Sequence, residues 1–245
     1  MLKSLSIGIL AWKSGQTLVD TLTTYHINGL LSITDDVKIL FQEYSEQDLQ
    51  IANHFGVQYI ALPDNIGIGK GFLTLAKKAK YDNILLLEHD WHLVENSICT
   101  LKRLQSGLEL LTQTDIIKYR HRTNPGYPLF SANVYKGNEL KHYDSEIDLI
   151  SPHLLESVHW LDPHKEFPDK VSKVGEYFTT TSRWGNWTNN PILVKKKFYI
   201  EVVNSYAGGG IDLEGNIAKW WSRQNFKVAH GEGLFSHKDI KKFKK

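Results

Sequence analysis

The sequence predicts an α/β protein with a mixed, mostly parallel sheet that is covered by helices on both faces. Short apolar segments alternate with longer segments of helical character over residues 1–90, and this alternation is typical of parallel sheets. Glycine, proline or polar residues bound most of the apolar segments, as they bound strands. The chain has 245 residues, 41% hydrophobic and 23% charged, which suffices for one large domain with a buried core.

The elements of the first half follow one another in a regular order. Gly29 and Gly56 close the first two helices, and Pro63 ends the third strand. The strand from Asn83 to Leu87 is the most apolar in the chain. The expected strands are 5–11, 37–42, 57–62 and 83–87, and the expected helices are 16–30, 46–55 and 69–80.

The second half has a weaker pattern. Residues 123–175 are rich in Pro, Gly, His and charged residues, and they predict an insertion or a set of long loops. Loops of that length in a compact domain are usually functional. Around them we expect a helix at 94–111, a strand at 115–122, a strand pair within 176–200, a helix at 214–224 and a last extended segment at 226–235.

The composition argues against several classes of protein. A formal net charge of +2 is too small to indicate nucleic acid as the main partner. The single cysteine, Cys99, excludes an internal disulfide and a multi-cysteine zinc site. We find no apolar run near the roughly 20 residues of a membrane span, and we expect a cytoplasmic location. The lysines within 238–245 predict a solvated tail, with contact to an anionic surface as the alternative.

A ligand site is expected at the carboxyl ends of the strands, because open sheets of this type bind ligands there. Polar or aromatic residues follow each of the four expected strands of the first half at that edge: Trp12 and Lys13, 43–45, 64–67, and 88–91. Trp91, Arg120 and Arg122 are further candidates for lining the pocket.

Glu88-His89-Asp90 is the strongest local signal. Side chains two apart on a strand point to the same face, so Glu88 and Asp90 can converge on one cation, or on a cation and a ribose. Oxygen ligands favour Mg²⁺ or Mn²⁺, with a diphosphate completing the shell. Solvated strand-end carboxylates are the alternative, and the triplet alone leaves the two interpretations equal.

Residues 65–71, Asn65-Ile66-Gly67-Ile68-Gly69-Lys70-Gly71, form a glycine-rich turn after the third strand. Such a turn lets a backbone approach a phosphate closely. It matches neither the P-loop pattern nor a dinucleotide fingerprint. We interpret Asn65, Gly67 and Lys70 as close to a nucleotide, although the glycines alone are also typical of a plain strand-to-helix turn.

Asp212 and Glu214 follow three glycines at the expected start of a helix. Acidic residues at that position are typical of helix capping, and a catalytic carboxylate is the alternative. Residues 184–191 combine aromatic and amide side chains, which suits a sugar site. For Trp187 in particular, a place in the core is the alternative.

The first 95 residues resemble the nucleotide-binding half of a GT-A glycosyltransferase of the family 2 type. Four features carry the resemblance: the opening strand Ser6 to Ala11, the strand end 41–45, the turn 63–67 and the acidic triplet 88–90. The usual acidic motif of that family is Asp-x-Asp, and Glu88 keeps its charge on a longer arm. The resemblance implies one domain with a nucleotide-binding half at 1–95, an acceptor-binding half at 96–237 and a basic tail at 238–245.

The resemblance also implies roles for individual residues. Asp90, Glu88 and His237 would bind Mn²⁺ or Mg²⁺, and His237 matches by its place after the last strand. Asp212, or Glu214 in its place, would be the general base of an inverting transfer. The residues expected to contact the nucleotide sugar are Ala11, Trp12, Glu43, Asn65, Gly67, Lys70, Glu88, His89 and Trp91. Those expected to contact the acceptor are Arg120, Trp184, Trp187 and Asn190.

The function implied is transfer of a sugar from a nucleoside diphosphate donor to a hydroxyl of a glycan or another acceptor. A UDP-sugar is favoured, with a GDP-sugar as the alternative. Two other functions stay open. A nucleotidyltransferase of similar fold would carry a basic, glycine-rich signature after the first strand, of which Ala11 to Gly15 is a poor version. A non-catalytic sugar- or nucleotide-binding module is the other.

Overall fold

Four parallel strands form the N-terminal part of the sheet: β1 (Leu5–Trp12), β2 (Val37–Gln42), β3 (Gln58–Leu62) and β4 (Asn83–Glu88). β1 lies between β2 and β4, and β3 is the edge strand beside β2. β1 is buried along its length except at Trp12, because its side chains pack on both faces of the sheet. The computed structural model describes residues 1–126, 162–206 and 213–238.

The sheet continues beyond β4 in mixed orientation. It contains β5 (Trp91–Leu93), β6 (Ile116–Arg120), β7 (Ser172–Val174), β8 (Tyr177–Thr181), β9 (Ile192–Lys195) and β10 (Lys227–His237). Across the described part of the chain the strand order is β3-β2-β1-β4-β9-β6-β10-β8-β7, and β5 pairs with β10 beside this path. β9 runs antiparallel between β4 and β6, whereas β6 and β10 are parallel. The prediction of a mixed, mostly parallel sheet in one α/β domain is confirmed.

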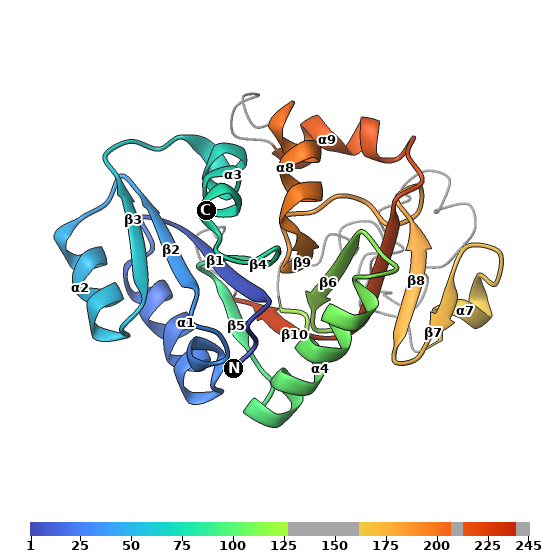
Figure 1. The fold of residues 1–245 in the computed structure, drawn as a ribbon, viewed down its shortest axis with the longest axis horizontal. Coiled ribbons are helices and arrows are strands. Elements are labelled where there is room, and N and C mark those ends of the chain that lie inside the picture. Colours follow the sequence, from blue (N-terminus) through green and yellow to red (C-terminus); the bar gives the residue numbers. More distant parts are fainter. Residues whose placement is uncertain (127–161, 207–212, 239–245) are drawn as a thin grey trace, which may run out of the picture.

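Helices cover both faces of this sheet (Figure 1). One face carries α1 (Gly15–Ile27), α2 (Glu46–His54) and α4 (Ser97–Leu110), with the short η1 (Leu30–Ser32) after α1. The other carries α3 (Gly67–Lys78), α8 (Lys196–Asn204) and α9 (Leu213–Trp221). The four-residue α7 (Pro163–Glu166) lies beside β7 (Figure 1). Each face has its own apolar core, and the strands separate the two.

The predicted elements of the first half lie within a few residues of those observed. Residues 176–200 contribute two strands to the sheet, as predicted, but the two do not pair with each other: β8 pairs with β7 and β10, whereas β9 pairs with β4 and β6. Residues 196–204 form α8 instead, and its buried residues Tyr199, Val202 and Val203 have helical spacing. Most of the predicted insertion, 127–161, lies outside the described residues.

Strand β10 contains a wide irregularity that determines where its end lies. It pairs regularly with β6 as far as His230 opposite Lys118, and the next pair is Phe235 opposite Arg120. Five residues of β10 therefore advance against two of β6, which is a large bulge. Beyond it, β10 pairs antiparallel with β5, with His237 opposite Trp91. The bulge thus brings the end of β10 to the segment that follows β4.

The helices of the described ranges include none with the length and apolar character needed to cross a membrane.

Candidate active site

Asp90 and His237 meet at the carboxyl edge of the sheet. Asp90 lies between β4 and β5, and His237 is the last residue of β10. His237 Nε2 is 3.4 Å from Asp90 Oδ2, and the His237 ring packs edge-on against Trp91 with a centroid distance of 4.7 Å. The backbone N–H of Lys238 donates to the Asp90 carbonyl over 2.8 Å. The two residues are far apart in the sequence, and the β5–β10 ladder joins them.

The Asp90 carboxylate is buried and ionised. Burial raises its pKa, but the hydrogen bond from His237 and the nearby charges of His89 and His237 more than offset this, so the pKa lies below the usual value. Among the described residues, Asp90 Oδ1 has no hydrogen-bond partner. A buried, charged oxygen without a partner is unfavourable in a folded protein. A cation bound beside Asp90 Oδ1 would neutralise its charge and give this oxygen a partner.

The structure brings two of the three predicted metal ligands, Asp90 and His237, into contact. No group of three His, Cys, Asp or Glu side chains in the described ranges is arranged to hold an ion. Burial and the charges of Asp90 and Glu214 raise the pKa of Glu88 well above the usual value, and its predicted role as a ligand stays a prediction. Asp90 and His237 lie in direct contact. They fit Mg²⁺ or Mn²⁺, which are commonly held by one or two carboxylates with the other positions filled by substrate phosphate and water.

The ends of β1 and β2 form a second cluster. Glu43 Oε2 accepts from Trp12 Nε1 over 2.8 Å and lies 2.7 Å from Lys13 Nζ. These hydrogen bonds lower the pKa of Glu43. Lys13 and Glu43 have positive φ angles, 47° and 49°, which non-glycine residues rarely adopt. Such strain is commonly found at ligand sites. Trp12 is 45% exposed, whereas Ala11 is buried and offers only its backbone.

The turn before α3 is held in place by side-chain amides. Asn65 Oδ1 accepts from the Gly67 N–H over 2.8 Å. Gln42, the last residue of β2, accepts from the Ile66 N–H through Oε1 over 2.9 Å. Gln42 was not among the predicted residues, although a polar residue that ends an apolar strand is a visible signal. Lys70 is exposed in the first turn of α3, and the N-terminus of a helix favours anions.

Glu214 lies at the start of α9, close to Glu88 and to a buried lysine. Its carboxylate accepts from the Asn189 N–H. Lys118 on β6 donates to the Asn186 carbonyl and to Thr188 Oγ1. Burial lowers the pKa of Lys118 well below its usual value, and the charge of Glu214 opposes that effect. Asp212 lies outside the described residues.

Two tryptophans among the candidates belong to the core. Trp91 and Trp187 are each 2% exposed. Trp187 packs against Tyr199 and Trp221 under α8 and α9, with centroid distances of 5.8 and 5.2 Å. The predicted contacts of Trp91 with the nucleotide sugar and of Trp187 with the acceptor are wrong for this structure, because neither ring reaches the surface.

The other candidates keep partial exposure. The Arg120 guanidinium lies 5.3 Å from the Trp91 ring and donates to the carbonyls of Pro125 and Gly126. These contacts support the chain beside His237, and the predicted role of Arg120 at the acceptor stays a prediction. Trp184 is half-buried with Lys170 Nζ 4.4 Å from its ring. Asn190 and His89 are also half-buried, and their predicted roles stay predictions.

Comparison with known proteins finds similarity in structure alone. The sequence matches no protein-family model and no curated protein. Staphylococcus aureus TarS 1-349 superposes with a TM-score of 0.57 at 13% identity, covering 96% of this chain and 60% of that one. The same protein in complex with UDP-GlcNAc gives a TM-score of 0.53 at 13% identity, covering 96% and 58%.

A Mycobacterium tuberculosis glucosyl-3-phosphoglycerate synthase in complex with Mg²⁺ and UDP gives a TM-score of 0.50 at 12% identity, covering 96% and 72%. This chain therefore spans about three fifths of the TarS structures and a larger share of the synthase. The fold is the GT-A glycosyltransferase fold, as the sequence predicted.

Proposed function

We propose that this chain is a metal-assisted glycosyltransferase that uses a nucleoside diphosphate sugar, with a UDP-sugar favoured. The observation that carries the proposal is the Asp90–His237 pair, in which a buried carboxylate oxygen has no partner among the described residues. The complexes of similar fold with UDP, UDP-GlcNAc and Mg²⁺ support the ligand classes. The strained cluster of Trp12, Lys13 and Glu43 supports a ligand at the same edge of the sheet.

Asp90 and His237 would hold the divalent cation beside the nucleotide. When bound, Mn²⁺ or Mg²⁺ would neutralise charge that builds on the departing nucleoside diphosphate. The amino end of α3 and Lys70 would approach the phosphates, because backbone N–H groups and a cation favour an anion there. The exposed Trp12 ring and Glu43 would contact the nucleoside. Gln42 would keep the intervening turn in position through its bond to Ile66.

Glu214 in the first turn of α9, or Asp212 two residues before it in the sequence, would act as the general base. Asp212 is the first choice and Glu214 the second. The base takes the proton of an acceptor hydroxyl, the acceptor oxygen bonds to the anomeric carbon, and the bond from that carbon to the phosphate oxygen breaks. The bonding electrons leave with the nucleoside diphosphate, and the configuration at the anomeric carbon inverts. The bond from Asn189 N–H stabilises the charged form of Glu214, which makes it the weaker base and favours Asp212.

The direct test is a thermal-shift screen of nucleoside diphosphates and their sugars, with Mn²⁺ or with a chelator. A ligand present at 100 times its Kd stabilises the folded state by about 2.7 kcal/mol. We expect UDP or a UDP-sugar to raise Tm with Mn²⁺ and much less with the chelator. Hits are then incubated with candidate acceptors, and the products are separated to distinguish sugar transfer from nucleotidyl transfer. A full panel without binding or turnover contradicts the proposal.

Asp90→Ala should abolish the metal-dependent part of nucleotide binding, because it removes the carboxylate whose oxygen lacks a partner among the described residues. Calorimetric titration with UDP, with and without Mn²⁺, measures this. Asp82→Ala is the matched control. Asp82 is an exposed acid that directly precedes the first residue of β4, and the variant should bind UDP as the unmodified protein does. Metal-dependent binding that survives Asp90→Ala removes Asp90 from the metal site.

Asp212→Asn should retain donor binding and lose transfer, because an amide cannot accept the proton of the acceptor hydroxyl. Donor binding is measured by calorimetry and transfer by product formation under the same conditions. Undiminished transfer would move the base to Glu214 or elsewhere.

A further inference from the structure

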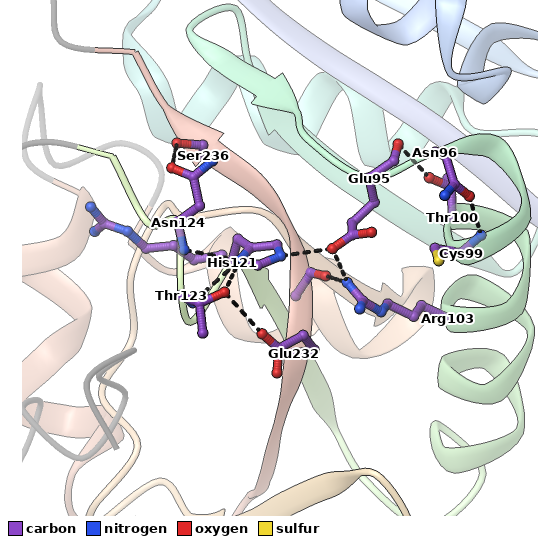
Figure 2. Close-up of polar contacts among 12 residues, drawn as sticks. Glu95, Asn96, Cys99, Thr100, Arg103, His121, Thr123, Asn124, Glu232 and Ser236 are labelled. Atoms are coloured by element: carbon purple, nitrogen blue, oxygen red, sulfur yellow. Dashed lines mark hydrogen bonds and ion pairs between the residues drawn. The ribbon is translucent and has the colours of Figure 1, made fainter. Parts of the chain in front are cut away.

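A partly buried polar network joins α4, the residue after β6 and the β10 bulge (Figure 2). The His121 Nε2 atom is 2.8 Å from Glu95 Oε1, and Arg103 Nη1 lies 2.9 Å from the same oxygen. Arg103 Nη1 also donates to the Gly233 carbonyl over 2.6 Å, inside the bulge. Burial raises the pKa of Glu95, but the bond from His121 and the charge of Arg103 lower it overall. Glu95 is therefore a fixed acceptor at neutral pH.

These contacts determine which nitrogen of His121 carries the proton. The Nδ1 atom faces the backbone N–H groups of Thr123 and Asn124, at 3.2 and 3.0 Å. Because both groups are donors, Nδ1 must accept, and the ring proton lies on Nε2 and points to Glu95. His121 thus connects a fixed carboxylate to the backbone of the following turn, residues 123–126. Figure 2 shows the ring between Glu95 on one side and Thr123 and Asn124 on the other.

The turn 123–126 contacts the segment that carries His237. The Pro125 carbonyl accepts from the His237 backbone N–H over 3.0 Å. Ser236 Oγ donates to Asn124 Oδ1 over 3.3 Å (Figure 2). Gly126 forms a β-bridge with His237, and a Cβ on Gly126 would lie only 1.9 Å from the His237 carbonyl oxygen. The position of the turn therefore determines the position of the His237 backbone.

We propose that His121 is a positioning residue for His237, and that the Glu95–His121 pair keeps the His237 imidazole facing Asp90. The inference rests on the proposed function in one respect, that His237 is a ligand of the metal. The segment from Asp90 to Glu95 is connected to His237 in two ways. β5 pairs with β10 at His237, and Glu95 reaches His237 again through His121 and the turn. Two independent attachments fix one side chain relative to another better than one does.

His121→Phe tests the proposal, because it keeps a planar ring but removes both nitrogens. Mn²⁺ affinity is measured by titration with saturating UDP, with free Mn²⁺ followed by electron paramagnetic resonance. We expect a loss of about 10-fold or more, which is typical when a residue that orients a metal ligand is removed. Hydrogen exchange of the His237 amide, measured without metal, should become faster because its acceptor Pro125 is no longer held.

Ser182→Ala is the matched control. Its hydroxyl is buried and accepts from the Phe226 N–H at the opposite end of β10, so it should lower stability without moving either readout. Glu95→Leu should repeat the effect of His121→Phe. Glu95→Gln should lose less Mn²⁺ affinity, because its amide oxygen still accepts from His121 Nε2. The two Glu95 variants test the proposal if His121→Phe does not fold.

Mn²⁺ affinity and His237 amide exchange that are unchanged in His121→Phe and in Glu95→Leu would overturn the proposal. If the unmodified protein binds no Mn²⁺ with UDP, the proposed metal site fails. The amide exchange rate still decides in that case, because it reports the position of His237 without metal.

Discussion

At the scale of single residues, the half-buried histidine His230 shows that the surroundings of an imidazole determine its charge. Its Nε2 lies 2.7 Å from the Arg120 carbonyl oxygen and donates to it. Burial lowers its pKa to about 3, the charge of Arg122 contributes, and the bond to the Arg120 carbonyl opposes the shift. His237, only seven residues later, lies at the edge of the sheet beside Asp90. Two histidines on one strand therefore have different surroundings: His230 donates to the backbone of β6, and His237 lies at the candidate site.

His230 predicts a loss of stability in mild acid. Its pKa is about 3 in the folded state, against about 6.5 in the unfolded chain. The unfolded chain therefore binds the proton first, so stability is complete above about pH 6.5 and falls as the pH drops toward the folded value. Between pH 7.5 and 5 this group alone should cost about 2 kcal/mol. His230→Gln keeps a donor and should reduce that decline in urea unfolding. An equal decline in both proteins contradicts the assignment.

The residues of the candidate site differ in how far sequence could place them. Asp90 and Glu43 follow apolar strands, so the edge at which they lie was predictable from strand alternation. Trp187 was not, because its burial depends on α8 and α9, which pack over it from distant parts of the chain. The pKa of Glu88 is raised by burial first and then by the charges of Asp90 and Glu214, and the local pattern around Glu88 reveals neither its burial nor Glu214.

At the scale of elements, the β10 bulge depends on one glycine. Gly233 has a φ of +81°, and a Cβ there would lie 2.1 Å from the Arg120 carbonyl oxygen. Its own carbonyl accepts from Arg103. The left-handed conformation lets the strand return to β6 at Phe235, from which it continues to β5.

Gly233→Ala should therefore destabilise the protein strongly and weaken Mn²⁺ binding, because the backbone of Arg120 would have to move. Gly175→Ala is the matched control. Gly175 has a φ of +58°, and a Cβ added there would meet no atom within 4 Å among the described residues, so it should cost only about 1 kcal/mol for the conformation itself. Urea unfolding measures both variants. Equal losses of unfolding free energy in the two variants would show that the backbone around Gly233 adjusts to a Cβ without strain.

Elements with a long apolar stretch could be predicted from the sequence. Very short strands, and pairings between strands that are distant in the sequence, could not. β2 has the predicted bounds, because the apolar residues Ile39 to Phe41 end at the polar Gln42. β5 and β7 have three residues each, too few to show a period. β8 pairs with β10, and β9 pairs with β4 and β6, so both have partners that are distant in the sequence. The bulge of β10 leaves no local signal in the strand sequence except its glycines.

At the scale of the whole molecule, a continuous sheet joins the two halves. β9 links β4 to β6, and β10 links β6 to β8 and β5. The apolar clusters on the two faces share strands, since Ile9 packs in one and Leu10 in the other. Neither half therefore has a core that is closed without the strands of the other.

We accordingly expect one cooperative unfolding transition. Far-ultraviolet circular dichroism reports all helices, whereas tryptophan fluorescence is weighted toward the second half, where Trp187 and Trp221 are buried. The two urea midpoints should coincide, as they do in two-state unfolding. Separate midpoints would show that residues 1–95 fold independently of the remainder.

The place of β10 in the sheet has a consequence for synthesis. β10 is the last strand of the described chain, yet it lies between β6 and β8 in the interior of the sheet. Chains fold from the amino end as the ribosome releases them, so β1 to β4 can pair early. β6 keeps an open edge, and Asp90 lacks its histidine, until residue 237 has been made. A growing or truncated chain can thus possess the strand ends proposed to bind the nucleotide while it still lacks the Asp90–His237 pair.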